Sequence, residues 1–146
     1  MILAEASAET VAAPATLFAI WGEMESWPEW NADTAWVRLD GPFEQGATGK
    51  LKPKGGPAVR FEVAKLTATE FDDVSRLLGA RLTFAHTVTP VADGRVSVGV
   101  RVELTGPLRP LWNLILGADI AKSVRPDLAA LIARAEARDA ATAGRA

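Results

Sequence analysis

His86, the only histidine of the 146-residue chain, lies in the apolar segment RLTFAHTVTP of residues 81–90. Its imidazole titrates near neutral pH without help from its surroundings, which suits it to general acid–base catalysis. A catalytic base also needs an orienting partner and a substrate within reach. The alternative is a buried ring that bonds one carbonyl or side chain, and we favour it because the neighbours on the same strand face are apolar. Between these two lies a third role, a single polar contact for a ligand in an apolar pocket.

The segment FDDVSRLLG of residues 71–79 carries the other side chains that could take part in such chemistry. Successive side chains of a strand point to opposite faces, so either its odd-numbered or its even-numbered residues point inward. The odd-numbered choice places Asp73 and Ser75 opposite His86 across a cavity, as a cyclase or hydrolase requires. The alternative is a solvated edge of the sheet, because aspartate is almost never fully buried without a partner.

The composition argues against several other kinds of site. The chain has no cysteine, which excludes disulfides, zinc–thiolate centres and thiol catalysis. It has no carboxylate cluster, two-histidine zinc motif, phosphate loop or dinucleotide fingerprint, so we expect neither a metal nor a cofactor. The formal net charge is −2, and Lys50, Lys52 and Lys54 fit a solvated strand face. We therefore expect no nucleic-acid partner.

The elements that must position these residues follow a simple order. After a first strand, Pro14 begins one short helix, and Ser26 and Glu29 form a capping box for a second. Six strands with short glycine-rich turns follow as an antiparallel meander. From residue 107 to about 138, apolar residues recur at helical spacing, and Pro126 is expected to kink this long helix. Its expected apolar stripe consists of Leu108, Leu111, Trp112, Ile115, Ile120, Val124, Leu128, Leu131 and Ala135.

The turn of the last hairpin predicts its register. The Asp-Gly pair at residues 93–94 suits a type I turn followed by a left-handed glycine bulge, which pairs Val91 with Arg95. Counting back from this turn pairs His86 with Val100, so the histidine lies on the apolar face of the sheet. The same count pairs apolar residues with one another: Val88 with Val98, Phe84 with Val102, and Leu82 with Leu104. Only the long helix is available to cover this dry face.

Four segments together carry a resemblance to a known fold. They are APATLFAIWGEMESWPEWN after the first strand, LDGPFEQGATGKLKPKGGP across the next two strands, FAHTVTPVADGRVSV in the last hairpin and LTGPL before the long helix. Their order resembles the helix-grip fold of the START-like (SRPBCC) superfamily, and more narrowly its bacterial polyketide cyclase/dehydrase-like branch. The resemblance implies an α+β fold in which a curved antiparallel sheet of about seven strands wraps around a long C-terminal helix, with two short helices between strands one and two. It also implies an apolar cavity that binds lipids, polyketides or similar molecules.

Enzymes, carriers, sensors and chaperone co-activators share this architecture, so the function has to be argued from the site. The leading hypothesis is the binding of a small hydrophobic ligand between sheet and helix. One alternative is a polyketide cyclase or dehydratase that uses His86 with Asp73 or Ser75, and another is a protein-partner module with a collapsed cavity. Trp27 and Trp30 could form a lid. The expected ligand-lining residues are Trp30, Phe61, Val63, Phe84, His86, Val98, Val100, Trp112 and Ile115.

The remaining expectations concern the chain as a whole. We expect one domain over residues 1–146, with residues 139–146 as a frayed tail. No secretory signal and no apolar run long enough to cross a bilayer is evident. We therefore expect a cytoplasmic protein without stable membrane insertion, either a monomer or a homodimer.

Overall fold

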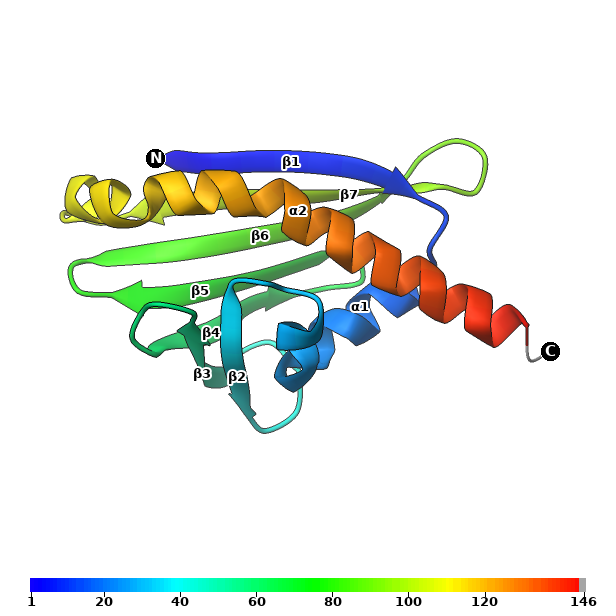
Figure 1. The fold of residues 1–146 in the computed structure, drawn as a ribbon, viewed down its shortest axis with the longest axis horizontal. Coiled ribbons are helices and arrows are strands. Elements are labelled where there is room, and N and C mark those ends of the chain that lie inside the picture. Colours follow the sequence, from blue (N-terminus) through cyan, green and yellow to red (C-terminus); the bar gives the residue numbers. More distant parts are fainter. Residues whose placement is uncertain (145–146) are drawn as a thin grey trace.

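The protein folds into a seven-stranded antiparallel sheet and a long C-terminal helix that lies across one face of it (Figure 1). The computed structural model describes residues 1–144. The strand order is β1-β7-β6-β5-β4-β3-β2, so only the β1–β7 pairing joins segments that are far apart in the chain. This is the helix-grip arrangement expected from the sequence. The elements are β1 Ile2–Thr10, α1 Pro14–Gly22, the 3₁₀ helix η1 Met24–Glu29, β2 Thr34–Asp40, β3 Thr48–Pro53, β4 Val59–Leu66, β5 Glu70–Leu77, β6 Ala80–Pro90, β7 Val96–Thr105 and α2 Arg109–Ala143.

The predicted register of the β6–β7 hairpin is confirmed. His86 pairs with Val100, and the three other predicted apolar pairs form on the same face. The turn differs from the prediction, because both Asp93 and Gly94 have positive φ angles, of 62° and 72°. Positive φ at both positions is typical of a type I′ turn, for which Asp-Gly is also a preferred sequence, and the Val91 N–H donates to the Arg95 carbonyl oxygen at 3.0 Å, as the predicted pairing requires.

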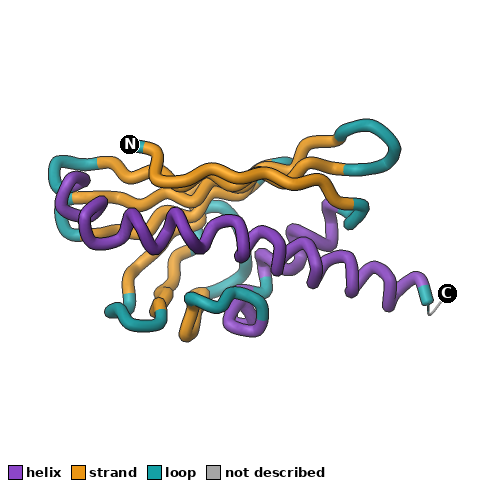
Figure 2. Tube along the Cα trace, turned by 45° about the horizontal axis from the view of Figure 1, so that its top comes forward, coloured by secondary structure: helices purple, strands orange, loops and turns teal. Residues whose placement is uncertain are grey.

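Helix α2 forms a second layer that packs mainly on β1 and β7, as Figure 2 shows from a second direction. Its buried residues are Gly117, Val124, Leu128, Leu131 and Ala135. The expected apolar stripe is therefore buried only in its second half. The first turns of α2 reach beyond the start of β1 (Figure 1), and they pack on the sheet only through half-buried residues such as Trp112 and Leu116.

Three local predictions need correction. The second short helix begins at Met24 and is a 3₁₀ helix, and the predicted capping box does not form because the Ser26 hydroxyl donates to the Glu23 carbonyl instead. The frayed tail does not begin at residue 139, because α2 continues to Ala143 and Asp139 accepts hydrogen bonds from the N-terminal part of α1. Residues 145–146 of the expected tail lie outside the described residues.

The core has two parts. The larger joins α1, η1 and the second half of α2 to the concave face of the sheet, and Trp21, Leu17, Ile20 and Phe71 are fully buried within it. The smaller lies under the first half of α2. None of the described helices is sufficiently long and apolar to span a membrane.

Candidate functional site

Strand register brings the candidate catalytic residues onto the concave face of the sheet. On β5, Phe71 pairs with His86 of β6, and Asp73 pairs with Phe84. Phe71, Asp73 and Ser75 are all buried, which confirms that the odd-numbered residues of β5 point inward. Asp73 and His86 are therefore diagonal neighbours on adjacent strands, within reach of side-chain interaction. We call Asp73, Ser75 and His86 the polar cluster; Asp73 lies between the other two along the strands, and Ser75, which pairs with Leu82, is four positions from His86.

The His86 ring is held by the strand beside it. Its Nδ1 lies 2.8 Å from the carbonyl oxygen of Phe71, and because a carbonyl can only accept, Nδ1 carries the proton. The ring stacks on Phe71 with 4.9 Å between centroids, and Trp21 of α1 packs against it at 5.1 Å. Burial lowers the pKa of His86 to about 4, although the bond to Phe71 acts in the opposite direction. The imidazole is thus neutral at neutral pH, and Nε2 is its acceptor.

The pKa of Asp73 shifts in the opposite direction from that of His86. Its side chain is buried, with 7% of its residue surface exposed, and makes no hydrogen bond or ion pair within residues 1–144. Burial, followed by the charge of Asp72, raises the pKa of Asp73 to about 8. At neutral pH this side chain is a carboxylic acid, so it is a hydrogen-bond donor.

The polar cluster has unpaired polar atoms that are not completely sealed from solvent. Among the described residues, the buried side-chain polar atoms that lack a hydrogen-bond partner are Trp30 Nε1 and Arg134 Nε. The carboxyl oxygens of Asp73, the hydroxyl of Ser75 and Nε2 of His86 also lack a partner, yet none is sealed off in this way. Each of these atoms therefore retains contact with a water-sized molecule.

The residues expected to line a cavity divide into two sets. Phe61, Val63 and Val98 are fully buried around the polar cluster, whereas Phe84 and Val100 are only half-buried although they face α2. The second set lies apart from the polar cluster. It comprises Trp30, which is half-buried beside Trp27; Trp112, whose Nε1 donates to the Leu78 carbonyl; and Ile115, which is 54% exposed on the first turns of α2.

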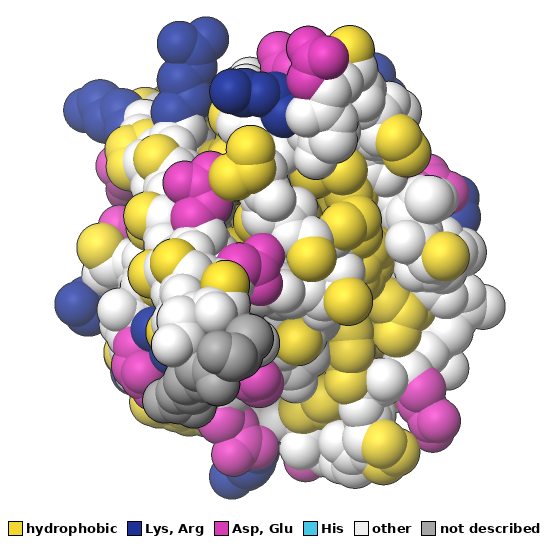
Figure 3. All heavy atoms as spheres, turned by 90° about the vertical axis from the view of Figure 1, so that its right-hand side faces the viewer, with side chains coloured by type: hydrophobic (Ala, Val, Ile, Leu, Met, Phe, Trp, Pro, Cys, Tyr) yellow, Lys and Arg dark blue, Asp and Glu magenta, His cyan; other side chains and the backbone are white. Residues whose placement is uncertain are grey.

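Two open hollows lie near this interior. One of about 910 Å³ runs along β1, β7 and β6 and meets α2 at Arg125, Leu128 and Ala129. The other, of about 500 Å³, lies between the α1–η1 segment and the loop that follows β2. Neither hollow is lined by a residue of the polar cluster, so other side chains separate the cluster from both hollows. Figure 3 shows the end of the molecule at which α2 terminates, where hydrophobic side chains form a recessed strip.

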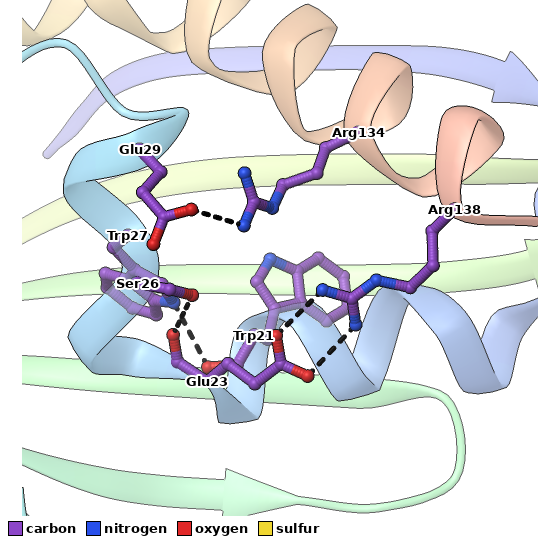
Figure 4. Close-up of polar contacts among 7 residues, drawn as sticks. All are labelled: Trp21, Glu23, Ser26, Trp27, Glu29, Arg134 and Arg138. Carbon is purple, nitrogen blue, oxygen red and sulfur yellow. Dashed lines mark hydrogen bonds and ion pairs between the residues drawn. The ribbon is translucent and has the colours of Figure 1, made fainter. Parts of the chain in front are cut away.

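Ion pairs fasten the α1–η1 segment to α2 (Figure 4). Arg138 of α2 donates two hydrogen bonds, of 2.9 and 2.8 Å, to the two carboxylate oxygens of Glu23, and Arg134 donates one of 2.9 Å to Glu29. Trp27 Nε1 donates to the carbonyl oxygen of Trp21. These contacts hold Trp21 over the His86 ring, so one wall of the site depends on two distant elements.

Sequence reasoning did not identify Trp21 as part of the site. Its helical spacing from Leu17 and Phe18 indicates a core position, which is correct, but only the tertiary structure places its ring on His86. The ion pairs of η1 with α2 also gave no local signal, because the partners are more than a hundred residues apart. In the part of the chain that the structure describes, no three acidic or histidine side chains gather to hold a metal ion.

Comparison with known proteins agrees with the helix-grip fold described above. A family model described as "Polyketide cyclase / dehydrase and lipid transport" matches residues 1–137. None of the curated proteins matches the chain.

Several solved structures share the fold at low sequence identity. The di-domain aromatase/cyclase StfQ of the steffimycin biosynthetic pathway matches with a TM-score of 0.73 and 17% identity, over 93% of this chain and 51% of that chain. The truncated norcoclaurine synthase of Thalictrum flavum matches with a TM-score of 0.68 and 11% identity, over 87% and 88% of the two chains. A START superfamily protein from Mycobacterium smegmatis has a TM-score of 0.62 and 16% identity, over 90% and 95%.

Proposed function

Because the chain belongs to the polyketide cyclase/dehydrase and lipid-transport family, we propose that it binds a small, largely apolar molecule between the sheet and α2. The observation that carries this proposal is the polar cluster. Three polar side chains lie on an otherwise apolar strand face, and Asp73, Ser75 and Nε2 of His86 have no protein partner. Natural proteins rarely leave buried polar groups unsatisfied, so a ligand or water completes their hydrogen bonds.

The chemistry of the polar cluster limits the ligand. Asp73 is a donor at neutral pH, His86 Nε2 is an acceptor, and the Ser75 hydroxyl can be either. No cationic side chain belongs to the cluster, so a carboxylate or phosphate would be buried there without a counter-charge. The ligand that fits has an apolar body and a neutral hydroxyl or carbonyl group.

The walls of the proposed site follow from burial. Phe61, Val63, Phe84, Val98 and Val100 remain the lining that we propose near the polar cluster. Trp30, Trp112 and Ile115 would contact only a ligand long enough to extend beyond it.

A matched pair of probes tests the proposal. We expect 1-decanol to quench or shift the tryptophan emission, because Trp21 contacts the His86 ring, and to raise the unfolding midpoint. Decanoate of the same chain length should bind at least about tenfold more weakly, since its charge would be desolvated. Equal binding of the two probes, or no midpoint shift with either, would contradict the proposal.

The test variant for this titration is Asp73→Leu, which replaces the carboxyl donor by an apolar side chain of similar length. It should bind 1-decanol more weakly but keep the preference over decanoate, because the charge of decanoate would still be desolvated. Native mass spectrometry of the protein purified from its own host should show a copurified neutral molecule if the site is filled in the cell.

A second function is favoured by one specific observation. Asp73 is protonated and His86 Nε2 is unprotonated at neutral pH, so the pair holds an acid and a base on diagonal positions of one face. We infer that, if the protein is an enzyme, His86 removes a proton next to a ligand carbonyl while Asp73 donates to the carbonyl oxygen.

Deuterium exchange separates binding from catalysis. An enzyme of this kind should accelerate the uptake of deuterium at the carbons beside the carbonyl of 2-decanone, followed by NMR. His86→Ala and Asp73→Asn should each abolish the acceleration. Binding of 2-decanone without any acceleration would leave the binding function and exclude this catalytic one.

A further inference from the structure

Five large hydrophobic side chains are exposed together at one end of the molecule. Leu78, in the β5–β6 turn, is 80% exposed, and Leu114 of α2 is 84% exposed. Leu108, Leu111 and Ile115, at the start of α2, are also exposed. Figures 1 and 2 both show the β5–β6 turn and the start of α2 at the same end of the molecule. We call these five residues the apolar tip.

The two elements of the apolar tip are joined as one platform. The backbone N–H of Leu108 donates to the Gly79 carbonyl oxygen at 2.9 Å, and Trp112 Nε1 donates to the Leu78 carbonyl oxygen at 2.8 Å. A Cβ atom on Gly79 would lie 2.6 Å from the Leu108 side chain, so this leucine packs directly on the turn. The apolar tip is therefore preformed, because neither element has to move to present it.

Three exposed arginines lie on the elements of the apolar tip: Arg76 and Arg81 on the sheet face opposite α2, and Arg109, whose guanidinium donates to the Gly106 carbonyl oxygen. Arg76 of β5 and Arg81 of β6 are directly opposite each other, and Arg109 is the first residue of α2. Within residues 1–144, none of the three forms an ion pair with a carboxylate. Like charges directly opposite on neighbouring strands destabilise a sheet. An anionic surface against this end would relieve that repulsion.

Other charges at this end strengthen the positive field. The β3–β4 turn contributes Lys54, and Arg60 follows at the start of β4, which lies beside the end of β5. The nearest carboxylates on the tip elements are Glu103, which is half-buried in β7, and Asp119, which lies about one turn beyond Ile115 on α2. Glu62 of β4 and Asp33, whose carbonyl oxygen accepts a hydrogen bond from the Lys54 N–H, also lie here, so the positive charge is concentrated on Arg60, Arg76 and Arg81.

We propose that the apolar tip docks this protein on the surface of an anionic lipid bilayer, with its five hydrophobic side chains in the interfacial region and the arginines on lipid phosphates. Large exposed apolar patches mark interaction sites, and their combination with basic residues suits an anionic membrane surface. A second copy of the chain fits less well. Two apolar tips in contact would bring Arg76, Arg81 and Arg109 of one copy against the same residues of the other.

Vesicle flotation tests the proposal, and it needs no cavity ligand. The protein should float with phosphatidylcholine vesicles that contain phosphatidylglycerol, and much less with phosphatidylcholine alone. The double variant Leu78→Ser/Leu114→Ser should bind about tenfold or more weakly, because two leucines no longer leave water. Its unfolding midpoint should be unchanged, since both side chains are at least 80% exposed. Val11→Ser, which changes an exposed residue after β1 at the other end, is the matched control and should bind like the wild type.

A second pair of variants tests the charges. Arg76→Gln/Arg81→Gln should lose the preference for phosphatidylglycerol, whereas Arg95→Gln/Arg125→Gln, with the same change in net charge, should keep it. Binding should also weaken as salt concentration rises. The proposal is overturned if the wild type does not float with phosphatidylglycerol vesicles at low salt, or if the leucine variant floats equally well. A dimer that the leucine variant abolishes, together with no vesicle binding, would instead assign the apolar tip to self-association.

Discussion

His86 and Asp73 are both neutral at neutral pH, although the carboxyl group of an aspartate is normally ionised there and the imidazole of a histidine normally titrates close to it. Burial is the dominant cause for both, because it disfavours the charged form of either group. The shifts have opposite signs, so the histidine keeps a free lone pair and the aspartate keeps a proton. That combination gives the polar cluster its capacity to recognise a neutral hydroxyl or carbonyl.

These two shifts make stability depend on pH in opposite directions. The pKa of Asp73 rises from 3.8 to about 8 on folding, so between these values the native state holds a proton that the unfolded chain has lost, and stability falls as pH rises. The pKa of His86 falls from 6.5 to about 4, so in that window the unfolded chain binds the extra proton, and stability falls as pH drops. The two effects oppose each other between about 4 and 6.5, and above 6.5 only that of Asp73 remains.

Asp73→Asn should isolate the aspartate effect. We expect the free energy of unfolding of the variant, minus that of the wild type, to increase with pH between about 4 and 8, by at most about 1.4 kcal/mol per pH unit. Urea denaturation at several pH values measures this difference. Asp127, whose pKa is raised to about 6 by burial and by Asp33, acts equally in both proteins and cancels. A difference that does not change with pH would show that Asp73 is ionised in the native state.

At the scale of elements, the site depends on how loops and helix ends are held. The β7–α2 connection turns at Gly106, which has a φ angle of +109° and lies against the β5–β6 turn. The α1–η1 segment is held to α2 by the two arginine–glutamate pairs. These two attachments add to the core packing that places α2 over the sheet and Trp21 over His86.

Gly106→Ala should destabilise the protein more than Gly41→Ala does. Gly41 has nearly the same φ angle, +108°, but a Cβ atom there would meet nothing within 4 Å, whereas one on Gly106 would lie 2.7 Å from the Gly79 carbonyl oxygen. Gly41→Ala thus measures the backbone strain alone, about 1–3 kcal/mol. We expect Gly106→Ala to cost about 1–3 kcal/mol more in urea unfolding, because the backbone must also shift. Equal costs would show that the connection adjusts freely.

The Glu23–Arg138 pair should contribute only modestly. Its side chains are 47% and 35% exposed, so solvent screens the attraction even though the hydrogen bonds from Arg138 lower the pKa of Glu23. A double-mutant cycle with Glu23→Gln and Arg138→Gln should give a coupling energy of about 0.5–1 kcal/mol. High salt should reduce it. A coupling near zero at low salt would mean that the packing of Trp21, and not the ion pair, positions α1.

At the scale of the whole molecule, β1 and α2 close the structure. Strand β1 pairs with β7, and α2 packs on both, so the first and last thirds of the chain complete one core. Bringing such distant segments together costs chain entropy before their contacts can stabilise the fold. The sheet and helix layers should therefore fold together.

Unfolding should be a single cooperative transition. Far-UV circular dichroism reports on the whole backbone, while tryptophan emission reports chiefly on the α1–η1 end, where Trp21, Trp27 and Trp30 lie. We expect the two urea transitions to coincide. An earlier fluorescence transition would show that the α1–η1 segment detaches from α2 before the sheet unfolds.

The sequence by itself determined the order of the elements, the register of the last hairpin and the apolar surroundings of His86. These features are local, because side chains alternate along a strand and a turn sets the pairing of the strands that it joins. Only the tertiary structure decided which face of β5 points inward, since residues 71–79 alternate equally well in both registers. It also decided that Leu108, Leu111 and Ile115 of the expected stripe of α2 stay exposed, because spacing along a helix does not reveal which of its turns the rest of the fold covers. Glu23 and Glu29 form ion pairs with arginines that are distant in the chain, so only the folded structure reveals these partners. The protonation of Asp73 likewise depends on burial, which exists only in the folded state.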